Sequence, residues 1–183
     1  MKKIIVFLAD GFEEVEALTC VDLLRRAGAQ VIAMSVNDKV SVEGAHDIEV
    51  VADTVFDKDE IRDADAIVLP GGMPGTLNLK NSPDIEETVK DFYKNNRLIC
   101  AICAAPMIPG SLGMLKGRAA CCYPGMEEHL TGADVKHDLV CRDGNIITGA
   151  GVGGAIAFAL EIIEYLFGAE DARNIRESIV YRF

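Results

Sequence analysis

The chain has 183 residues, of which 50% are hydrophobic and 26% are charged, a globular composition long enough to bury a full core. The length suits one domain, residues 1–183, and is too short for two ordinary ones. With 18 Lys and Arg against 29 Asp and Glu, the net charge is −11 at pH 7, so the molecule repels phosphate polymers and anionic membranes, and we expect no nucleic-acid or membrane partner.

The N-terminus begins Met1-Lys2-Lys3 and continues with IIVFLA, the charge order of an export signal. The apolar run is too short for such a signal and an acidic segment follows at once, so we predict a first strand instead. No apolar run approaches the roughly 20 residues of a membrane-spanning helix. Six cysteines without an export signal favour a cytoplasmic location, where they are thiols.

The first half of the chain alternates strand and helix patterns. The helix at 13–28 has apolar positions at helical spacing and ends at Gly28. The helix from Ser82 to about Asn96 has Pro83 at its first position. A polar stretch with short strand-like pieces, VSVEG and HDIEVVA, lies between. Buried strands are predicted at 4–9, 30–36 and 63–69, the last running into a glycine turn.

The second half continues the alternation. A strand, LICAIC, is followed by a short helix near Ala105, and a hairpin is centred on Asp143-Gly144. The remaining predicted elements are a strand at 118–123, a short helix in PGMEEHL and helices at 155–168 and 171–183. This order predicts an α/β fold, flavodoxin-like and doubly wound, with a mainly parallel sheet covered by helices on both faces.

Ligands of such folds bind at the carboxyl ends of the strands. Three strand ends carry chemically useful groups: Asp10–Glu16, Pro70–Gly75 and Cys103–Pro106. Cys103 lies at a strand-to-helix turn, where a nucleophile is held on a sharp corner and the helix dipole stabilises a thiolate. The turn supplies backbone N–H groups, from Ala104 and from Gly71 and Gly72, for an oxyanion or an oxidised sulfur.

A carboxyl group at Glu16 could donate a proton to this sulfur or accept one, and helical periodicity puts Glu13 and Glu16 nearer one face than Glu14. The residues alone leave alternatives open. Cys103 could be an inert core cysteine, Glu16 a solvated or capping residue, and the glycine loop a simple turn.

The other cysteines give weaker signals. Cys100 lies inside the apolar strand, so Cys100-Ala-Ile-Cys103 is not expected to act as a redox dithiol. Cys121 and Cys122 are adjacent on a strand and face opposite ways, which argues against zinc, and we expect no metal site. Cys20 and Cys141 are interpreted as packing residues.

Four blocks carry a family resemblance: FLADGFEEVEALTCVDLLRRAG, VLPGGMPGTLNL, ICAICAAPMIPGSLGMLKGRAACCYPG and DGNIITGAGVGGAIAFALEIIE. Their order and spacing resemble the ThiJ/PfpI superfamily, in the branch that includes the Parkinsonism-associated protein and bacterial proteins described as deglycases or thiazole-biosynthesis enzymes. The resemblance covers nearly the whole chain. It implies a class I glutamine amidotransferase-like sheet and a homodimer.

The resemblance also implies roles for single residues. Cys103 matches the family's nucleophilic, easily oxidised cysteine, and Glu16 matches the protonated glutamate that hydrogen-bonds it. Gly72, with Gly71, and Ala104 match the backbone donors around the site. Two further positions match residues near the pocket or the dimer interface: Arg26, and His46, where some members have another arginine.

Two departures from the family pattern concern the pocket. The family's Ser-Arg-Gly-Pro-Gly-Thr segment reads Gly-Ala-Gly-Val-Gly-Gly at 149–154, which removes an arginine that would hold an anionic substrate. Neither His129 nor His137 matches the histidine that many members place near the cysteine, so a Cys-His pair is not expected and peptidase activity is the least supported reading.

The expected function is therefore a cysteine-dependent hydrolase or lyase of the glyoxalase or deglycase type. It would act on a small carbonyl substrate or a glycated protein without a metal or organic cofactor. The alternative is a redox-sensing stress-response protein or chaperone that uses oxidation of the same cysteine with little turnover.

Overall fold

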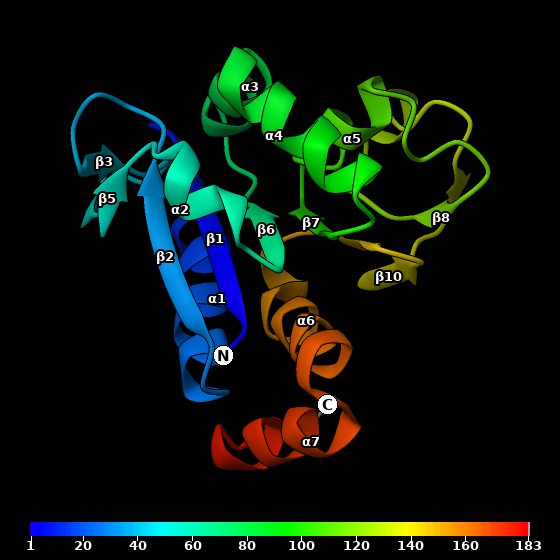
Figure 1. Cartoon of the computed structure of the whole chain (residues 1–183). Coiled ribbons are helices and arrows are strands. Elements are labelled where there is room, and N and C mark those ends of the chain that lie inside the picture. The colour runs from blue at the N-terminus through cyan, green and yellow to red at the C-terminus, as the bar shows by residue number, and fades with distance from the viewer. Residues whose placement is uncertain (183) are drawn as a thin grey trace.

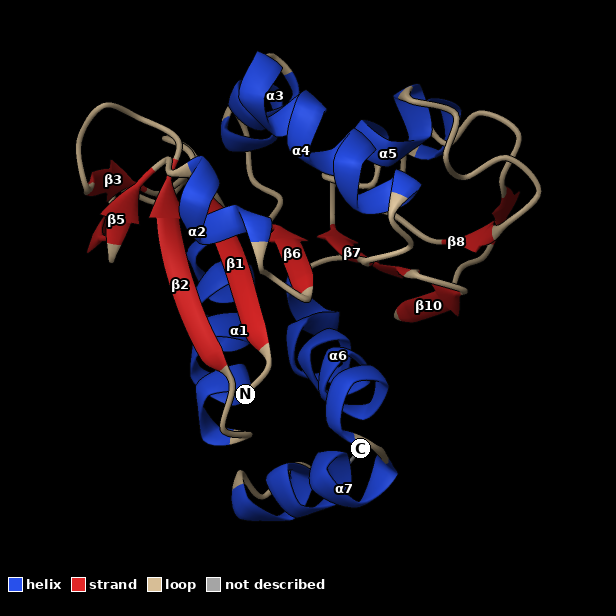
Figure 2. Cartoon of the chain, viewed as in Figure 1, coloured by secondary structure: helices blue, strands red, loops and turns tan. Residues whose placement is uncertain are grey.

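The computed structural model describes residues 1–182, and its centre is a seven-stranded sheet in the order β10-β11-β7-β6-β1-β2-β5. Neighbouring strands are parallel except for the antiparallel pair of β10 and β11. The doubly wound, mainly parallel sheet predicted from the sequence is confirmed (Figures 1 and 2). The strands are β1 (Lys3–Leu8), β2 (Gln30–Ser35), β5 (Thr54–Val55), β6 (Ala66–Leu69), β7 (Leu98–Ile102), β10 (Val140–Asp143) and β11 (Ile146–Gly149).

Helices cover both faces of the sheet, because alternate residues of each buried strand point to opposite sides. Ile4, Val6 and Leu8 of β1 belong to one core, whereas Ile5 and Phe7 belong to the other. The first face carries α1 (Glu14–Arg26), α6 (Ala155–Phe167) and α7 (Ala169–Ser178), and the second carries α2 (Lys58–Arg62), α3 (Gly75–Lys80), α4 (Pro83–Lys94) and α5 (Met107–Ser111) (Figure 1).

The smaller elements depart most from the sequence prediction. The predicted strand at 118–123 is reduced to β8 (Ala119–Ala120), which pairs with β9 (Asp134–Val135). The predicted glycine turn continues into α3, which was not expected. The polar stretch forms the hairpin of β3 (Ser41–Glu43) and β4 (Glu49–Val51), and two 3-10 helices occur, η1 (Glu127–His129) and η2 (Val152–Gly154).

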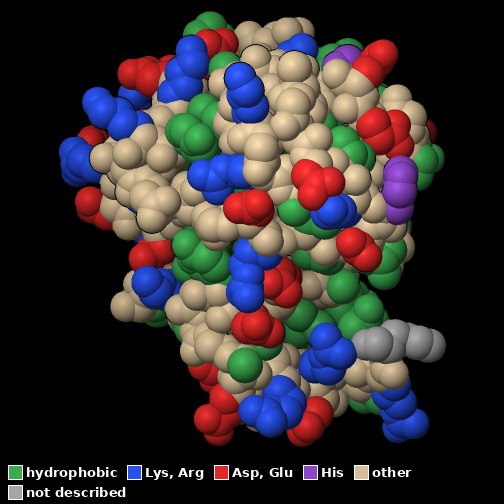
Figure 3. All heavy atoms as spheres, turned by 90° about the vertical axis from the view of Figure 1, so that its right-hand side faces the viewer, with side chains coloured by type: hydrophobic (Ala, Val, Ile, Leu, Met, Phe, Trp, Pro, Cys, Tyr) green, Lys and Arg blue, Asp and Glu red, His purple; other side chains and the backbone are tan. Residues whose placement is uncertain are grey.

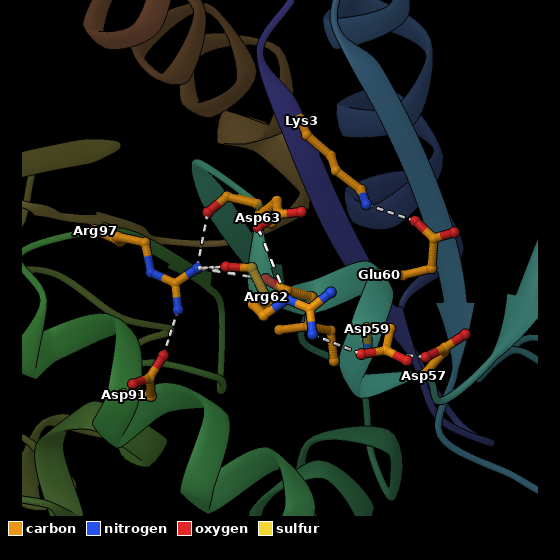
Figure 4. A network of polar contacts seen from close by, with 10 residues as sticks. Lys3, Asp57, Asp59, Glu60, Arg62, Asp63, Asp91 and Arg97 are labelled. Atoms are coloured by element: carbon orange, nitrogen blue, oxygen red, sulfur yellow. Dashed lines mark hydrogen bonds and ion pairs between the residues drawn. The ribbon is translucent and has the colours of Figure 1, made fainter.

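Arg97, just before β7, joins the second layer of helices to the sheet (Figure 4). Its guanidinium donates to the carbonyls of Arg62 and Ala64, both at 3.0 Å, at the end of α2. It also pairs with Asp91 of α4 and lies 3.6 Å from the ring centroid of Phe92. These contacts satisfy carbonyls that a helix terminus leaves free, and they tie the start of β7 to α2 and α4.

The surface carries both signs of charge. On the face shown in Figure 3, Lys and Arg side chains lie among Asp and Glu side chains rather than in one basic area. Within residues 1–182, no helix has the length and apolar character required to cross a bilayer. The part of the predicted last helix at Phe183 lies outside the described residues.

Candidate active site

Cys103 follows the last residue of β7 and has a left-handed backbone, with φ of +64°. This conformation is unfavourable for a residue with a Cβ and is kept only where the surroundings hold it. Here the N–H of Cys103 donates to the carbonyl of Gly149 at 2.8 Å, and its carbonyl accepts from the N–H of Tyr123 at 2.8 Å. The strand therefore ends in a sharp corner that presents the thiol at the sheet edge.

The Glu16 carboxyl group lies beside this thiol and is fully buried. Its Oε2 accepts a hydrogen bond from the N–H of Gly71 at 2.8 Å, and Oε1 makes no hydrogen bond of ordinary geometry. A Cβ at position 71 would lie 2.5 Å from Cys103 Cβ and 2.7 Å from Glu16 Oε2. Only glycine allows this approach, so Gly71 contacts both groups at once.

Burial raises the pKa of Glu16 from 4.5 to about 7, against the lowering effect of the Gly71 N–H and the Cys103 thiol. Burial and the charge of Glu16 raise the pKa of Cys103 to about 12, while the N–H groups of Ala104 and Gly72 lower it. The Glu16 carboxylate and the Cys103 thiolate repel each other only when both groups are ionised. The thiol therefore keeps its proton across the neutral range, whereas the carboxyl changes from protonated to ionised near pH 7.

The backbone donors thus divide into two groups. The backbone N–H groups of Gly72 and Ala104 act on the sulfur of Cys103 and lower its pKa. The N–H of Gly71, expected to point at the same place, instead donates to Glu16. Gly71 therefore influences the sulfur through the carboxyl, and a developing oxyanion next to the sulfur has two N–H donors within reach.

A cleft of about 480 Å³ opens above the thiol. Its floor is formed by Gly72 and Cys103, and Glu13 lines one side. The walls come from two segments that lie on either side of the β10–β11 hairpin: Tyr123, Pro124 and Leu139 before β11, and Ala150, Gly151, Val152, Gly153 and Gly154 after it. The glycine-rich segment is thus a wall of the site rather than only a packing turn.

Glu13, Glu14 and His46 are brought together at the start of α1, with potential ligand atoms all within 4.8 Å of one another. The oxygens of Glu14 are already engaged, because Oε1 accepts from the His46 N–H at 2.7 Å and Oε2 contacts His46 Nδ1 at 2.8 Å. Burial acts to raise the pKa of Glu14, but hydrogen bonds from His46 outweigh it and the net pKa is lowered. We interpret this group, called the clasp below, as a set of polar contacts that holds the β3–β4 hairpin against the start of α1.

The structure does not bring the other singled-out residues to the thiol. Arg26 lies at the opposite end of α1, where it pairs with Asp22 at 3.0 Å and lines a different cleft. His46 touches the acidic residues of α1, and neither His129 nor His137 lines the cleft above Cys103. Cys100 is fully buried within β7, as expected.

Sequence reasoning missed Tyr123, Leu139 and Val152, which form the apolar walls of the cleft. No periodic pattern marks them, since they lie in loops and a 3-10 helix. The one usable signal was an aromatic residue before proline, Tyr123-Pro124, near the end of the third block that carries the family resemblance.

Comparisons with known proteins identify a family and related structures. Residues 2–165 match the model of the DJ-1/PfpI family. Proteins DJ-1 homolog B and DJ-1 homolog A of Arabidopsis thaliana are each 40% identical over 99% of this chain, which spans only 42% and 47% of their lengths. Glutathione-independent glyoxalase DJR-1.2 of Caenorhabditis elegans is 32% identical over 94% of this chain and 92% of its own. The structure of oxidized Toxoplasma gondii DJ-1 matches with a TM-score of 0.94, at 34% identity and full coverage of both chains.

We expect Glu16→Gln to change how stability depends on pH. A carboxyl whose pKa is raised from 4.5 to about 7 stabilises the fold while protonated, and this contribution is lost as pH rises through that window. Wild type should lose about 3 kcal/mol relative to Glu16→Gln between pH 4.5 and pH 8, at about 1.4 kcal/mol per pKa unit.

Urea unfolding of both proteins across this pH range measures the difference. Glu170→Gln, at an exposed position of α7, controls for the general effect of removing a carboxylate. Parallel stability curves for wild type and Glu16→Gln would show that folding does not raise the pKa of Glu16.

Proposed function

This chain belongs to the DJ-1/PfpI family, and we propose that it is a cysteine-dependent enzyme of the glyoxalase or deglycase type, acting on small reactive carbonyl compounds or their protein adducts. The observation that carries the proposal is the pairing of Cys103, on a strained corner with two N–H donors, with a buried carboxyl of raised pKa. A relative named as a glutathione-independent glyoxalase supports the same type of activity for this chain.

The first step would be addition of the thiol to an aldehyde. Glu16 takes the proton of Cys103, and the sulfur forms a bond to the aldehyde carbon, C1. The carbonyl oxygen that gains negative charge lies where the N–H groups of Gly72 and Ala104 can stabilise it. It then receives the proton from Glu16, giving a hemithioacetal, so the carboxyl begins and ends this step ionised.

The second stage would be an isomerisation followed by hydrolysis. For a 2-oxoaldehyde, Glu16 removes the hydrogen of C1 as a proton while the C2 oxygen is protonated from solvent, giving an enediol. Glu16 returns its proton to C2 and the C1 hydroxyl loses its own, which leaves a thioester of a 2-hydroxy acid. Water cleaves this thioester and restores the Cys103 thiol, so C1 is oxidised, C2 is reduced and no external redox partner is needed.

A second candidate function is oxidation sensing at the same residue. The N–H groups that would stabilise an oxyanion could also donate hydrogen bonds to an oxidised sulfur, since sulfinate oxygens are strong acceptors. In this reading a protonated Glu16 donates to the sulfinate, and the protein signals its oxidation state with little turnover.

We also propose that the chain forms a homodimer in a reducing, cytoplasmic compartment. All six cysteines are free thiols, which suits such a compartment. Val15 and Leu18 of α1 expose 48% and 39% of their surface, and Ile48 and Val51 of the neighbouring hairpin expose 52% and 73%. The clasp of Glu14 and His46 holds this hairpin against α1, so the apolar side chains belong to adjoining elements suited to a second copy.

Turnover of methylglyoxal tests the enzyme proposal. We expect Cys103→Ser to abolish lactate formation and Glu16→Gln to lower kcat by at least about 100-fold, the contribution typical of a general acid–base group. Cys122→Ser, at a buried cysteine outside the cleft, should retain activity. Full activity in Cys103→Ser would contradict the proposal.

Intact-mass measurement across a peroxide series tests the second candidate. We expect a gain of two oxygen atoms that is absent from Cys103→Ser and that leaves the fold intact. Direct conversion to a sulfonate, or an equal gain in the serine variant, would remove the sulfinate reading.

Sedimentation velocity tests the dimer. Leu18→Glu places a charge on the proposed interface and should yield monomers, whereas Val55→Glu, on the edge strand β5, should leave the dimer unchanged. A monomeric wild type at micromolar concentration would refute the proposed dimer.

A further inference from the structure

The walls of the cleft above Cys103 are apolar and accessible. Tyr123, Leu139 and Val152 expose 54%, 54% and 45% of their surface, and all three line the cleft. Pro124 and Ala150 complete these walls. The volume of about 480 Å³ lies within the range of small-molecule sites, roughly 300–1,000 Å³, and leaves room for a substituent much larger than a methyl group.

The charge of the cleft is of one sign. Glu13 is the one ionisable carboxyl side chain among its lining residues, and that side chain is 11% exposed. Its nearest cationic partner is His46, at 3.5 Å, which also contacts Glu14 at 2.8 Å. Two carboxylates thus share one imidazole, and no lysine or arginine is present among the described residues that line the cleft. A local negative charge remains even when His46 is protonated.

The aromatic wall is held at a fixed place relative to the nucleophile. The backbone N–H of Tyr123 donates to the carbonyl of Cys103 at 2.8 Å. A Cβ at Gly151 would lie 3.4 Å from Tyr123 Cδ2 and 3.9 Å from Cys103 Sγ. The ring edge and the sulfur therefore border the same glycine, so a group attached next to the reacting carbon would meet the tyrosine.

We propose that this cleft selects uncharged electrophiles with a large apolar substituent, an aryl or branched alkyl group, and disfavours those that carry a carboxylate. Tyr123, Leu139 and Val152 determine the preference for apolar groups, and Glu13 repels anions. The inference rests on the proposed function for the chemical class of the substrate. Together, the two predict that the preferred substrate is a 2-oxoaldehyde with an aryl or branched alkyl substituent. Apolar burial favours the substituent, and an anion next to Glu13 meets a like charge in a partly desolvated site.

Alkylation of Cys103 tests this selectivity without requiring turnover. N-benzyliodoacetamide, iodoacetamide and iodoacetate differ in substituent and charge, and each rate is divided by the rate of the same reagent with free glutathione. We expect the normalised rate at Cys103, followed by peptide mapping, to be highest for the benzyl reagent and lowest for iodoacetate, with at least about a tenfold difference between them.

Two variants examine the assigned residues. Val152→Lys should reduce the benzyl-to-acetate ratio at least about fivefold, and Glu13→Gln should raise the iodoacetate rate by a larger factor than it changes the rates of the two neutral reagents. Val55→Lys, at an exposed valine on the far edge of the sheet, should match wild type. Equal normalised rates for the three reagents in wild type, or a change in Val55→Lys as large as in Val152→Lys, would overturn the inference.

Turnover separates this inference from the proposed function. We expect kcat/KM to fall in the order phenylglyoxal, methylglyoxal, glyoxylate, with no activity in Cys103→Ser. Equal values for these aldehydes, with the serine variant inactive, would leave the enzyme assignment standing and refute the selectivity. An alkylation preference without turnover of any aldehyde would support the selectivity and refute the enzyme assignment.

Discussion

The backbone of Cys103 is held on both sides by hydrogen bonds from different parts of the chain. Its N–H donates to the carbonyl of Gly149 at the end of β11, and its carbonyl accepts from the N–H of Tyr123, which lies in the long segment between β7 and β10. These two bonds keep a conformation that costs of order 1–3 kcal/mol for a residue with a Cβ. They also tie the sheet, the nucleophile and the cleft wall together, so the position of the thiol and the shape of the cleft are set by the same contacts.

Close approach of the glycine loop to the first turn supplies the second part of the site. A Cβ at Gly72 would lie 2.4 Å from the backbone nitrogen of Glu13, and one at Gly75 would lie 2.5 Å from that of Phe12. The loop after β6 therefore packs directly onto the start of α1, which leaves Glu16 enclosed beside the sulfur. Enclosure removes water from the carboxyl, and this desolvation is what keeps its proton near neutral pH.

Much of this could be read from the sequence, because it follows from local rules. Apolar runs and helix boundaries located the strands, and the rule that ligands bind at their carboxyl ends placed Cys103, Glu16 and the glycine loop together. The periodicity of α1 grouped Glu13 with Glu16, but Glu13 lies with Glu14 beside His46, and only Glu16 is enclosed beside the thiol. The walls of the cleft were not foreseen, since Tyr123 and Leu139 reach it through non-periodic loops whose paths depend on tertiary hydrogen bonds. Arg26 was expected near the pocket or an interface, and the length of α1 keeps it from the cysteine.

The central claim is that the Glu16 carboxyl, enclosed beside the Cys103 thiol, changes from protonated to ionised near neutral pH, where it can take up the proton of the thiol. NMR titration of the Glu16 side-chain carboxyl carbon, assigned by its loss in Glu16→Gln, tests the claim directly. Our account predicts a midpoint close to pH 7. A midpoint near the ordinary value of 4.5 would show that burial does not raise the pKa of this carboxyl, and would contradict a Glu16 whose basicity is matched to proton exchange at neutral pH.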